Sequence, residues 1–265
     1  WEKTRSWNSC LVDFERTSTC STSWTLIQFH AVRFDGGISG KVHLRHVLQD
    51  PVMEARLDVK DFSLNRALLG RADILGSWDK ELGGVRLNAD IRRDNACTTQ
   101  VIGYVSPKMK GLDLHIQAGG TPLSFLQPFV ENIFSNVNGS AHGDVHLFGP
   151  FSQLDLEGKV KAQMQMKVNI LNTTFLASAD SVHIASGLFR FQNVRLQDTE
   201  GHTGLADGEL RHTKLKDLSY RSRFQTNRMR VFYSERETPE FPFYGKIYAT
   251  GDVMLRGGDG QLNVT

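Results

Sequence analysis

The sequence predicts an all-β fold: a long, curled antiparallel or meander-like sheet that forms an apolar groove, with one or two short amphipathic helices. Three observations support this prediction. Apolar and polar residues alternate along most of the chain, the polar positions are rich in charged side chains, and glycines recur just before the alternating stretches. Alternation with a period of two places every second side chain on the same side of a strand.

The alternation is clear in residues 85–91, 112–116 and 154–162, and it returns in 220–224 and 247–255. Lys, Arg, Asp and His are frequent in the polar phase of these stretches. A face with so many charges must meet water, so each strand is covered on one side only. This pattern favours antiparallel strands over the doubly buried strands of an α/β core.

Glycine precedes many of the predicted strands, as at Gly40, Gly143, Gly158 and Gly251. Glycine tolerates positive φ and a close approach of two backbones, so at strand entries it suits turns, bulges and the bends by which a sheet curls. The spacing of these glycines is irregular, which argues against a propeller or a solenoid of fixed period.

Some segments break the alternation. Within residues 122–135 the apolar residues recur at helical spacing, which predicts a short amphipathic helix that Pro128 kinks or divides. A weaker helical turn is expected within 61–70. Residues 237–245 carry two prolines among aromatic residues and are expected to form an ordered loop, and residues 257–260 are expected to form a hairpin turn.

These features divide the chain into three stretches. Residues 1–50 alternate poorly and are assigned only some strand, near 24–29. Residues 51–236 are expected to form the curled groove, with the short helix near 122–135. Residues 237–265 are expected to continue the groove after the loop of prolines and aromatic residues.

Composition excludes some classes of function. The 31 basic and 29 acidic residues leave a formal net charge of +2 with no basic run, so nucleic acid is not an expected partner. No stretch reaches the roughly 20 apolar residues of a membrane span. The three cysteines indicate no disulfide framework, although a Cys10–Cys20 bridge stays open.

No catalytic motif is found. A G-x-S-x-G nucleophile elbow, a cysteine supported by histidine and a phosphate-binding glycine loop are all missing from the sequence. We therefore expect no enzyme, no catalytic residue and no cofactor. His142, Asp144 and His146 share one face of a predicted strand and are zinc-ligand types, but this is where a solvated face belongs, so no metal site is predicted.

Two stretches carry a resemblance to a known family. Residues 137–160 read VNGSAHGDVHLFGPFSQLDLEGKV, and residues 243–257 read FYGKIYATGDVMLRG. Their glycines and alternating hydrophobic residues resemble the recurring pattern of the AsmA/TamB-like family of the bacterial envelope, the second stretch its Bacteroidota members in particular. The resemblance covers roughly residues 50–260. It is one of pattern, and brings no active-site residues with it.

The resemblance implies a periplasmic section of a longer, inner-membrane-anchored translocation and assembly protein, whose anchor lies outside this chain. Its implied partners are a phospholipid or other acyl-chain ligand, an outer-membrane barrel protein of the BamA/TamA type and the remainder of its own chain. Its implied function is lipid transport, assembly and secretion of outer-membrane β-barrel proteins, or both. The candidate groove lining consists of Val85, Leu87, Leu112, Leu114, Val145, Leu147, Leu154, Leu156, Val160, Ile247, Val253 and Leu255.

Two other classes of protein stay open on the sequence. The first is a closed β-sandwich or β-solenoid module for adhesion or glycan binding, in which the same apolar residues would form an ordinary core. The second is an envelope hydrolase, which would need polar groups that converge in a pocket. The sequence does not separate a groove lining from a closed core, because both use the same alternation.

Overall fold

The computed structural model describes residues 9–16, 33–45, 52–213, 216–239, 241–258 and 261–264 of the 265-residue chain. It confirms the all-β fold class. The strands follow one another in the sheet in the order of the sequence, so the topology is a meander. The strand expected near residues 24–29 lies outside the described residues. No helix in these ranges has the length and apolar character that crossing a membrane requires.

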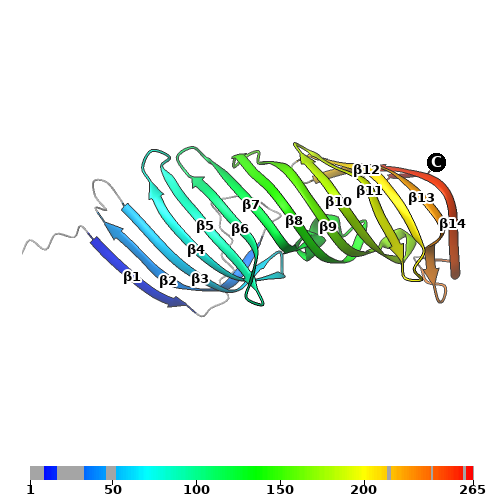
Figure 1. Cartoon of the computed structure of the whole chain (residues 1–265), viewed down its shortest axis with the longest axis horizontal. Helices are drawn as coiled ribbons and strands as arrows, with labels where there is room; N and C mark the ends of the chain where they lie inside the picture. The colour runs from blue at the N-terminus through cyan, green and yellow to red at the C-terminus, as the bar shows by residue number, and fades with distance from the viewer. Residues whose placement is uncertain are drawn as a thin grey trace, which may run out of the picture. The chain divides into compact units, whose positions relative to one another are not determined.

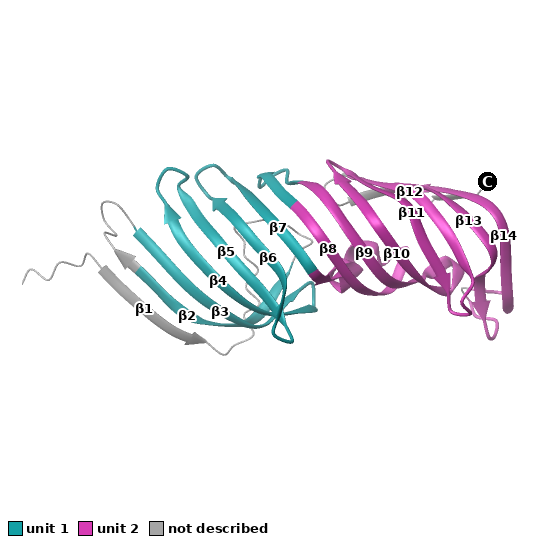
Figure 2. Cartoon of the chain, viewed as in Figure 1, with its two compact units in different colours: residues 1–119, 146–155 teal, residues 120–145, 156–265 magenta. Residues whose placement is uncertain are grey.

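The chain divides into two compact units (Figure 2). Unit 1 comprises residues 1–119 and 146–155, and unit 2 comprises residues 120–145 and 156–265. Strands β7 (Gly111–Pro122), β8 (Phe134–Pro150) and β9 (Asp155–Val168) therefore contribute residues to both units. The division into units rests on contacts in space, whereas the three stretches expected from the sequence follow the alternation and its interruptions.

Unit 1 is built from sequential antiparallel strands, each hydrogen-bonded to the next (Figure 1). Within the described part of unit 1, each strand is hydrogen-bonded only to the strands next to it in the sequence. The strands there form one open sheet and do not form the two packed sheets of a β-sandwich. The strands are β1 (Ser9–Arg16), β2 (Phe34–Arg45), β3 (Val52–Leu64), β4 (Ala67–Asp79), β5 (Gly84–Arg93), β6 (Ala96–Ser106) and β7 (Gly111–Pro122).

Unit 2 continues the antiparallel meander and contains the short helices. After η1 (Leu123–Leu126) and α1 (Gln127–Val130) come β8 (Phe134–Pro150), β9 (Asp155–Val168), η2 (Asn169–Leu171), β10 (Thr173–Ala185), β11 (Leu188–Asp198), β12 (Thr203–Thr213), β13 (Lys216–Ser234), β14 (Gly245–Gly258) and β15 (Gln261–Val264).

The sheet of unit 2 is curled. Strands β10 and β13 are three positions apart, and in a flat sheet about 14 Å would separate them. Instead, Nδ2 of Asn172, just before β10, donates a 2.6 Å hydrogen bond to the carbonyl oxygen of Tyr233 in β13. The backbone N–H of Arg230 in β13 likewise donates to Asp198 at the end of β11, at 2.7 Å. Curvature therefore brings distant strands into contact.

β-Bulges accompany this curvature. The register shifts between Ala179 and Val182 in β10, between Phe191 and Val194 in β11, and between Thr226 and Met229 in β13. At each of these bulges, three residue steps on one strand lie opposite two steps on its partner, so the residues on both sides of the bulge stay on the same face. A bulge bends its strand and increases the local twist, which favours curling.

Two strand glycines permit a close approach of neighbouring backbones. Gly103 has φ 155° and Gly143 has φ 142°. A Cβ on Gly103 would lie 2.0 Å from the carbonyl oxygen of Asp113, and one on Gly143 would lie 2.2 Å from that of Lys159. Real Cβ atoms do not approach a carbonyl oxygen so closely, so a side chain at either position would separate the two strands.

The helix expected within 122–135 forms, but it is shorter than the spacing of apolar residues suggests. Pro128 stands in the first turn of α1 and divides it from the 3-10 turn η1. Proline has no backbone N–H and therefore ends the hydrogen bonding of the preceding turn. Phe134, which continues the helical spacing, instead begins β8.

The helical turn expected within 61–70 is wrong, because these residues form the hairpin of β3 and β4. Asn65 and Arg66 have φ of 52° and 68°, as the two central residues of a type I′ turn require. Asn65 also exchanges two hydrogen bonds with Arg33: its N–H donates to the Arg33 carbonyl at 2.8 Å, and its Oδ1 accepts from the Arg33 N–H at 2.9 Å.

The loop expected within 237–245 is confirmed for the residues that are described. It connects β13 to β14 as a hairpin, because Ser234 pairs with Gly245 at its base. Strands β14 and β15 also pair antiparallel, with Gly258 opposite Gln261. Residues 259–260 of the hairpin turn expected at 257–260 lie outside the described residues.

Candidate functional site: an apolar sheet face in each unit

In unit 1, the register gathers the apolar residues of successive strands on one face. One cross-strand row runs from Leu57 through Ile74, Ala89 and Val101 to Ile116. The parallel row beside it passes through Ala55, Gly76, Leu87, Gly103 and Leu114. Cross-strand pairs on one face are in direct contact, so these rows form one continuous apolar surface.

Most of the large side chains on this surface are half-buried. Leu57, Ile74, Leu87 and Leu114 all have intermediate exposure, whereas Ile91 and Leu112 are buried. The half-buried residues still present apolar area to solvent or to a ligand. In this respect the face differs from a sealed core, in which large apolar residues contact other side chains on all sides.

Four predicted lining residues come together in unit 1. Val85 and Leu112 both pair with Val105, and Leu87 and Leu114 both pair with Gly103. They therefore share one face as two neighbouring rows. Leu147 and Leu154 also belong to unit 1 and are half-buried, the first in β8 and the second just before β9.

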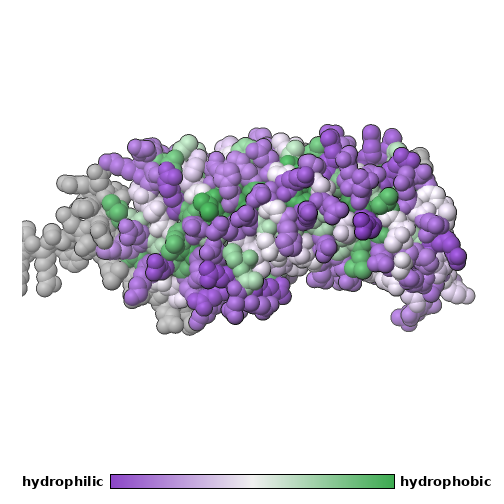
Figure 3. Space-filling view, viewed as in Figure 1, coloured by the Kyte–Doolittle hydropathy of each residue, from purple (hydrophilic) through white to green (hydrophobic). Residues whose placement is uncertain are grey.

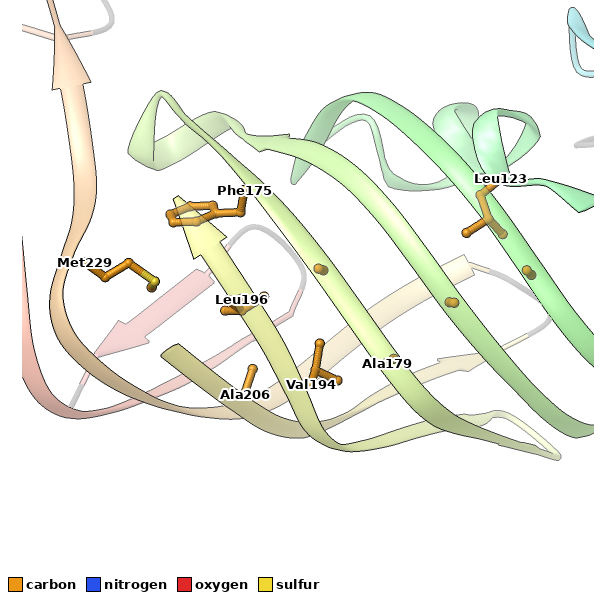
Figure 4. Close-up of a cluster of buried hydrophobic side chains, with 10 residues drawn as sticks. Leu123, Phe175, Ala179, Val194, Leu196, Ala206 and Met229 are labelled. Carbon is orange, nitrogen blue, oxygen red and sulfur yellow. The ribbon is translucent and has the colours of Figure 1, made fainter. Parts of the chain in front are cut away.

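In unit 2, the apolar face lies on the inside of the curl. Figure 4 shows Phe175, Leu196 and Met229 projecting from β10, β11 and β13 into the space that the curved strands enclose. Leu123 of η1 and the small residues of β8 and β9 join the same cluster. The buried members are Leu123, Ala141, Ala162, Phe175, Ala177, Ala179, Val194, Leu196, Ala206 and Met229.

The remaining predicted lining residues lie in unit 2. Val160 pairs with Val182, and Val253 pairs with Phe224, which places both pairs on the apolar face. Leu255 pairs with Ser222 on the same face. Ile247 pairs with Phe232 but is 49% exposed, so it covers little apolar area. Val145 and Leu156 are half-buried.

The predicted lining omits the best-buried residues of unit 2. Phe175, Ala177 and Ala179 alternate correctly, but two of the three are alanines, which give a weak apolar signal. The bulge that follows then shifts the phase before Val182. A search that allowed a three-residue step within a strand would have joined Ala179 to Val182 and found this strand.

The opposite face of the sheet is polar. Figure 3 shows mostly hydrophilic side chains on the face it presents, with hydrophobic residues in separate patches. Cross-strand ion pairs on this face include Arg71 with Asp58 and Arg223 with Asp252. The apolar exceptions, such as Leu75 and Ile102, are each 47% exposed. The two faces therefore differ strongly in polarity, as the alternation predicts.

A network of charged groups joins the β11–β12 turn to strands β13 and β14 in unit 2. Glu200 accepts hydrogen bonds from Lys246 Nζ at 2.7 Å, Tyr248 Oη at 2.8 Å and Arg230 Nη1 at 2.9 Å. These groups, the Lys246 hydrogen bond foremost, lower the pKa of Glu200 from 4.5 to about 2. Glu200 is therefore ionised at neutral pH and pairs with two cations.

Asp198 completes the same network from a buried position. Burial raises the pKa of its carboxyl, but hydrogen bonds from the backbone N–H groups of Arg230, Glu200 and His202 and from the His202 ring outweigh this, so the net pKa is lowered. The carboxylate thus accepts hydrogen bonds both from backbone N–H groups of the β11–β12 turn and from a backbone N–H group of strand β13. We interpret the network as structural, because both of its carboxylates, Asp198 and Glu200, already accept hydrogen bonds from several groups of the protein.

The histidine and aspartate residues weighed as zinc ligands do not come together as a set. His142 and Asp144 are exposed on β8. His146 instead lies against β7, with its Nε2 3.0 Å from Asp113 Oδ1 and with His115 close by. Reading one strand at a time missed this group, because it depends on the register between two strands.

No family model, curated protein or solved structure matches the chain. The fold and the two faces of the sheet therefore carry the functional argument.

Proposed function

We propose that the chain shields the acyl chains of a phospholipid, or of another ligand with acyl chains, on the apolar face of its sheet. The observation that carries this proposal is the continuous, half-buried apolar surface of unit 1, opposite a charged face. The chain acts in this proposal as a carrier surface. No side chain is assigned a catalytic role.

The energy of burial supports an acyl ligand. Transfer of a methylene from water to an apolar site is worth about 0.8 kcal/mol, so two chains of ~16 carbons represent on the order of 25 kcal/mol. Only a contiguous apolar surface can offset most of this cost, because each methylene along the chain needs an apolar neighbour. The rows of unit 1 supply such neighbours across β3 to β7.

The sequence resemblance to the AsmA/TamB-like family supports a setting for this function. We propose that the chain is a periplasmic section of an inner-membrane-anchored protein that works with an outer-membrane partner of the BamA/TamA type. Such a surface suits two roles: transport of lipid, and assistance in the assembly of outer-membrane β-barrel proteins. Detection of lipid bound to the purified chain would favour lipid transport.

The first experiment measures bound lipid directly. The chain is purified without detergent, extracted with organic solvent and analysed by mass spectrometry. A double variant, Leu87→Asp with Leu114→Asp, introduces two charges into one row of the apolar face. We expect phospholipid or fatty acid in the parent and a loss of most of it in the variant.

The matched control makes the same chemical change on the other face. Leu75 and Ile102 both pair with Asn88 on the polar side of the sheet and are each 47% exposed. Leu75→Asp with Ile102→Asp should retain the lipid. If the lining variant loses its β circular dichroism, Leu87→Thr with Leu114→Thr replaces it, because threonine keeps high strand propensity.

Two results would count against the proposal. Equal lipid in the parent and in a folded lining variant would show that the ligand lies elsewhere. A parent without any lipid, including after incubation with phospholipid vesicles, would leave assembly of barrel proteins as the better account.

A further inference from the structure

The apolar face of unit 1 ends beside two neighbouring hairpin turns. Val105 pairs with Val85 on one side and with Leu112 on the other, and this is the last apolar row before the turns. The next pairs along the strands close the β4–β5 and β6–β7 hairpins. Turns 80–83 and 107–110 therefore border this end of the apolar face.

Hydrogen bonds join the two turns. The hydroxyl of Ser106, which is fully buried, donates to the Leu82 carbonyl oxygen at 2.6 Å and accepts the backbone N–H of Met109 at 3.0 Å. The backbone N–H of Lys108 donates to the carbonyl oxygen of Gly83 at 3.5 Å. The backbone of the second turn is therefore held in place before any ligand binds.

Two lysines of the second turn have cationic groups without a partner. Lys108 and Lys110 are exposed, and within the described parts of the chain neither ammonium group forms an ion pair or a hydrogen bond. The stem of Lys108 packs on Gly83, where an added Cβ would lie 2.7 Å from Cβ of Lys108. The carbonyl oxygen of Lys110 accepts the N–H of Phe151 at 2.7 Å. Less conformational entropy is then lost when these lysines bind a ligand.

The charge of the two turns favours an anion. Their cations are Lys80, Lys108 and Lys110, and their one acid is Glu81. The resulting net charge of +2 equals the formal net charge of the whole chain, so the remaining residues sum to zero. The carboxylate of Asp79, just before the first turn, already accepts hydrogen bonds from the Leu82 N–H and from Arg86.

Met109 adds apolar area between the two lysines. Its side chain is 58% exposed, which is unfavourable in water. An apolar residue flanked by cations fits the junction of a charged head group with acyl chains, whereas a free phosphate would leave it in solvent. The strands are also long enough for such chains: the 11 residues of β6 span roughly 35 Å, whereas the hydrocarbon of one leaflet is about 15 Å deep.

We propose that the turn at 107–110 binds the head group of an anionic phospholipid whose acyl chains lie on the apolar face of unit 1. Lys108 and Lys110 bind the phosphate as point charges, and Met109 contacts the adjoining methylenes. Because this assignment rests on the proposed acyl-chain surface, it specifies the class of lipid at that same site. The two lysines are residues that determine specificity.

The test compares two lipids that differ in head-group charge. Isothermal titration calorimetry of the whole chain uses short-chain phosphatidylglycerol and phosphatidylcholine with identical acyl chains, each below its critical micelle concentration. A lysine beside an anionic lipid contributes about fivefold in affinity. We therefore expect phosphatidylglycerol to bind on the order of 20-fold more tightly, and this preference should decrease as salt is added.

Variants assign the preference to the turn. Lys108→Gln with Lys110→Gln should bring the affinity for phosphatidylglycerol close to that for phosphatidylcholine, whereas Lys108→Arg with Lys110→Arg should retain most of the preference. Lys159→Gln with Lys161→Gln removes two exposed lysines of β9 in unit 2 and should leave the preference unchanged. If the first variant loses its β circular dichroism, Lys108→Met with Lys110→Met replaces it, because methionine keeps an unbranched stem.

The outcomes distinguish the role of the lysines from the proposed function. Equal binding of the two lipids by the parent, or an undiminished preference in the folded glutamine variant, would overturn the role of the lysines and leave the acyl-chain surface standing. Failure of both lipids to bind would overturn both. Glycerol phosphate carries the phosphate without acyl chains. If it bound as tightly as phosphatidylglycerol, the turn would be a site for free phosphate, and the assignment to a lipid would be wrong.

Discussion

Glu200 shows how one carboxylate can connect separate elements of unit 2. It accepts hydrogen bonds from Arg230 of β13 and from Lys246 and Tyr248 of β14, while it belongs to the turn after β11. The carboxylate is ionised in the folded chain down to a pH of about 2, because its pKa is lowered to that value. Its hydrogen bonds with Arg230 and Lys246 therefore join opposite charges over most of the accessible pH range.

This gives a pH dependence with a definite sign. The pKa of Glu200 is about 2 in the folded chain and near 4.5 when the network is lost. The unfolded chain therefore binds more protons between these values, and stability rises with pH across this window. The contribution of Glu200 is fully present above pH 4.5 and is lost as pH falls toward 2.

Substitution isolates this contribution. Glu200→Gln should lower the urea midpoint at pH 7 and should make the midpoint fall less steeply between pH 4.5 and 2 than in the parent. Glu131→Gln, an exposed glutamate of the α1–β8 connection, controls for the loss of one negative charge. Parallel pH profiles for the parent and Glu200→Gln would contradict the assigned network.

The two 3-10 turns of unit 2 show that short elements of the same kind differ in what they support. Leu123 of η1 is 6% exposed and packs in the cluster that includes Ala141 and Ala162. Ile170 of η2 is 59% exposed. The first turn is therefore part of the core of unit 2, whereas the apolar residue at the centre of the second turn remains in solvent.

The difference predicts unequal effects of truncation. Leu123→Ala should lower the free energy of unfolding by about 2 to 4 kcal/mol, because it removes buried methyl groups and leaves a cavity. Ile170→Ala should change it by less than about 0.5 kcal/mol. Urea denaturation followed by circular dichroism measures both. Equal effects of the two substitutions would show that η1 does not pack on the sheet.

At the scale of the whole molecule, the sheet separates an apolar face from a charged face in each unit. In unit 1, the rows through Leu57 and Leu87 extend across consecutive strands without a polar interruption. On such a surface each further methylene of a bound acyl chain finds apolar neighbours. The affinity should therefore increase with the number of methylenes until the chain covers the whole surface.

A ligand series tests this expectation. Calorimetry with saturated fatty acids of increasing length, each below its critical micelle concentration, should show affinity that rises about fourfold per methylene, from about 0.8 kcal/mol each. Binding should also have a negative heat-capacity change, the mark of apolar burial. Affinity that does not depend on chain length would indicate recognition of the head group alone.

Much of the fold follows from local pattern, and so does part of the candidate site. Alternation predicts Val85, Leu87, Leu112 and Leu114 as lining residues, and the register places them in two adjacent rows. It does not predict Phe175 and Leu196, because bulges in β10 and β11 interrupt the period of two. The sequence around Asn65 predicts a helical turn where the structure has a hairpin, since apolar residues over so short a stretch fit either structure.

The sequence by itself determined that this chain forms one-sided antiparallel strands, because the period of two is a property of neighbouring residues. It also determined which residues share a face along the stretches of strand that no bulge interrupts. Only the tertiary structure decided how far unit 2 curls, which places Asp198 against Arg230, and which strand register brings His146 to Asp113 and His115. These contacts join residues about 30 positions apart. They depend on bulges and on pairing between strands, which no local pattern encodes.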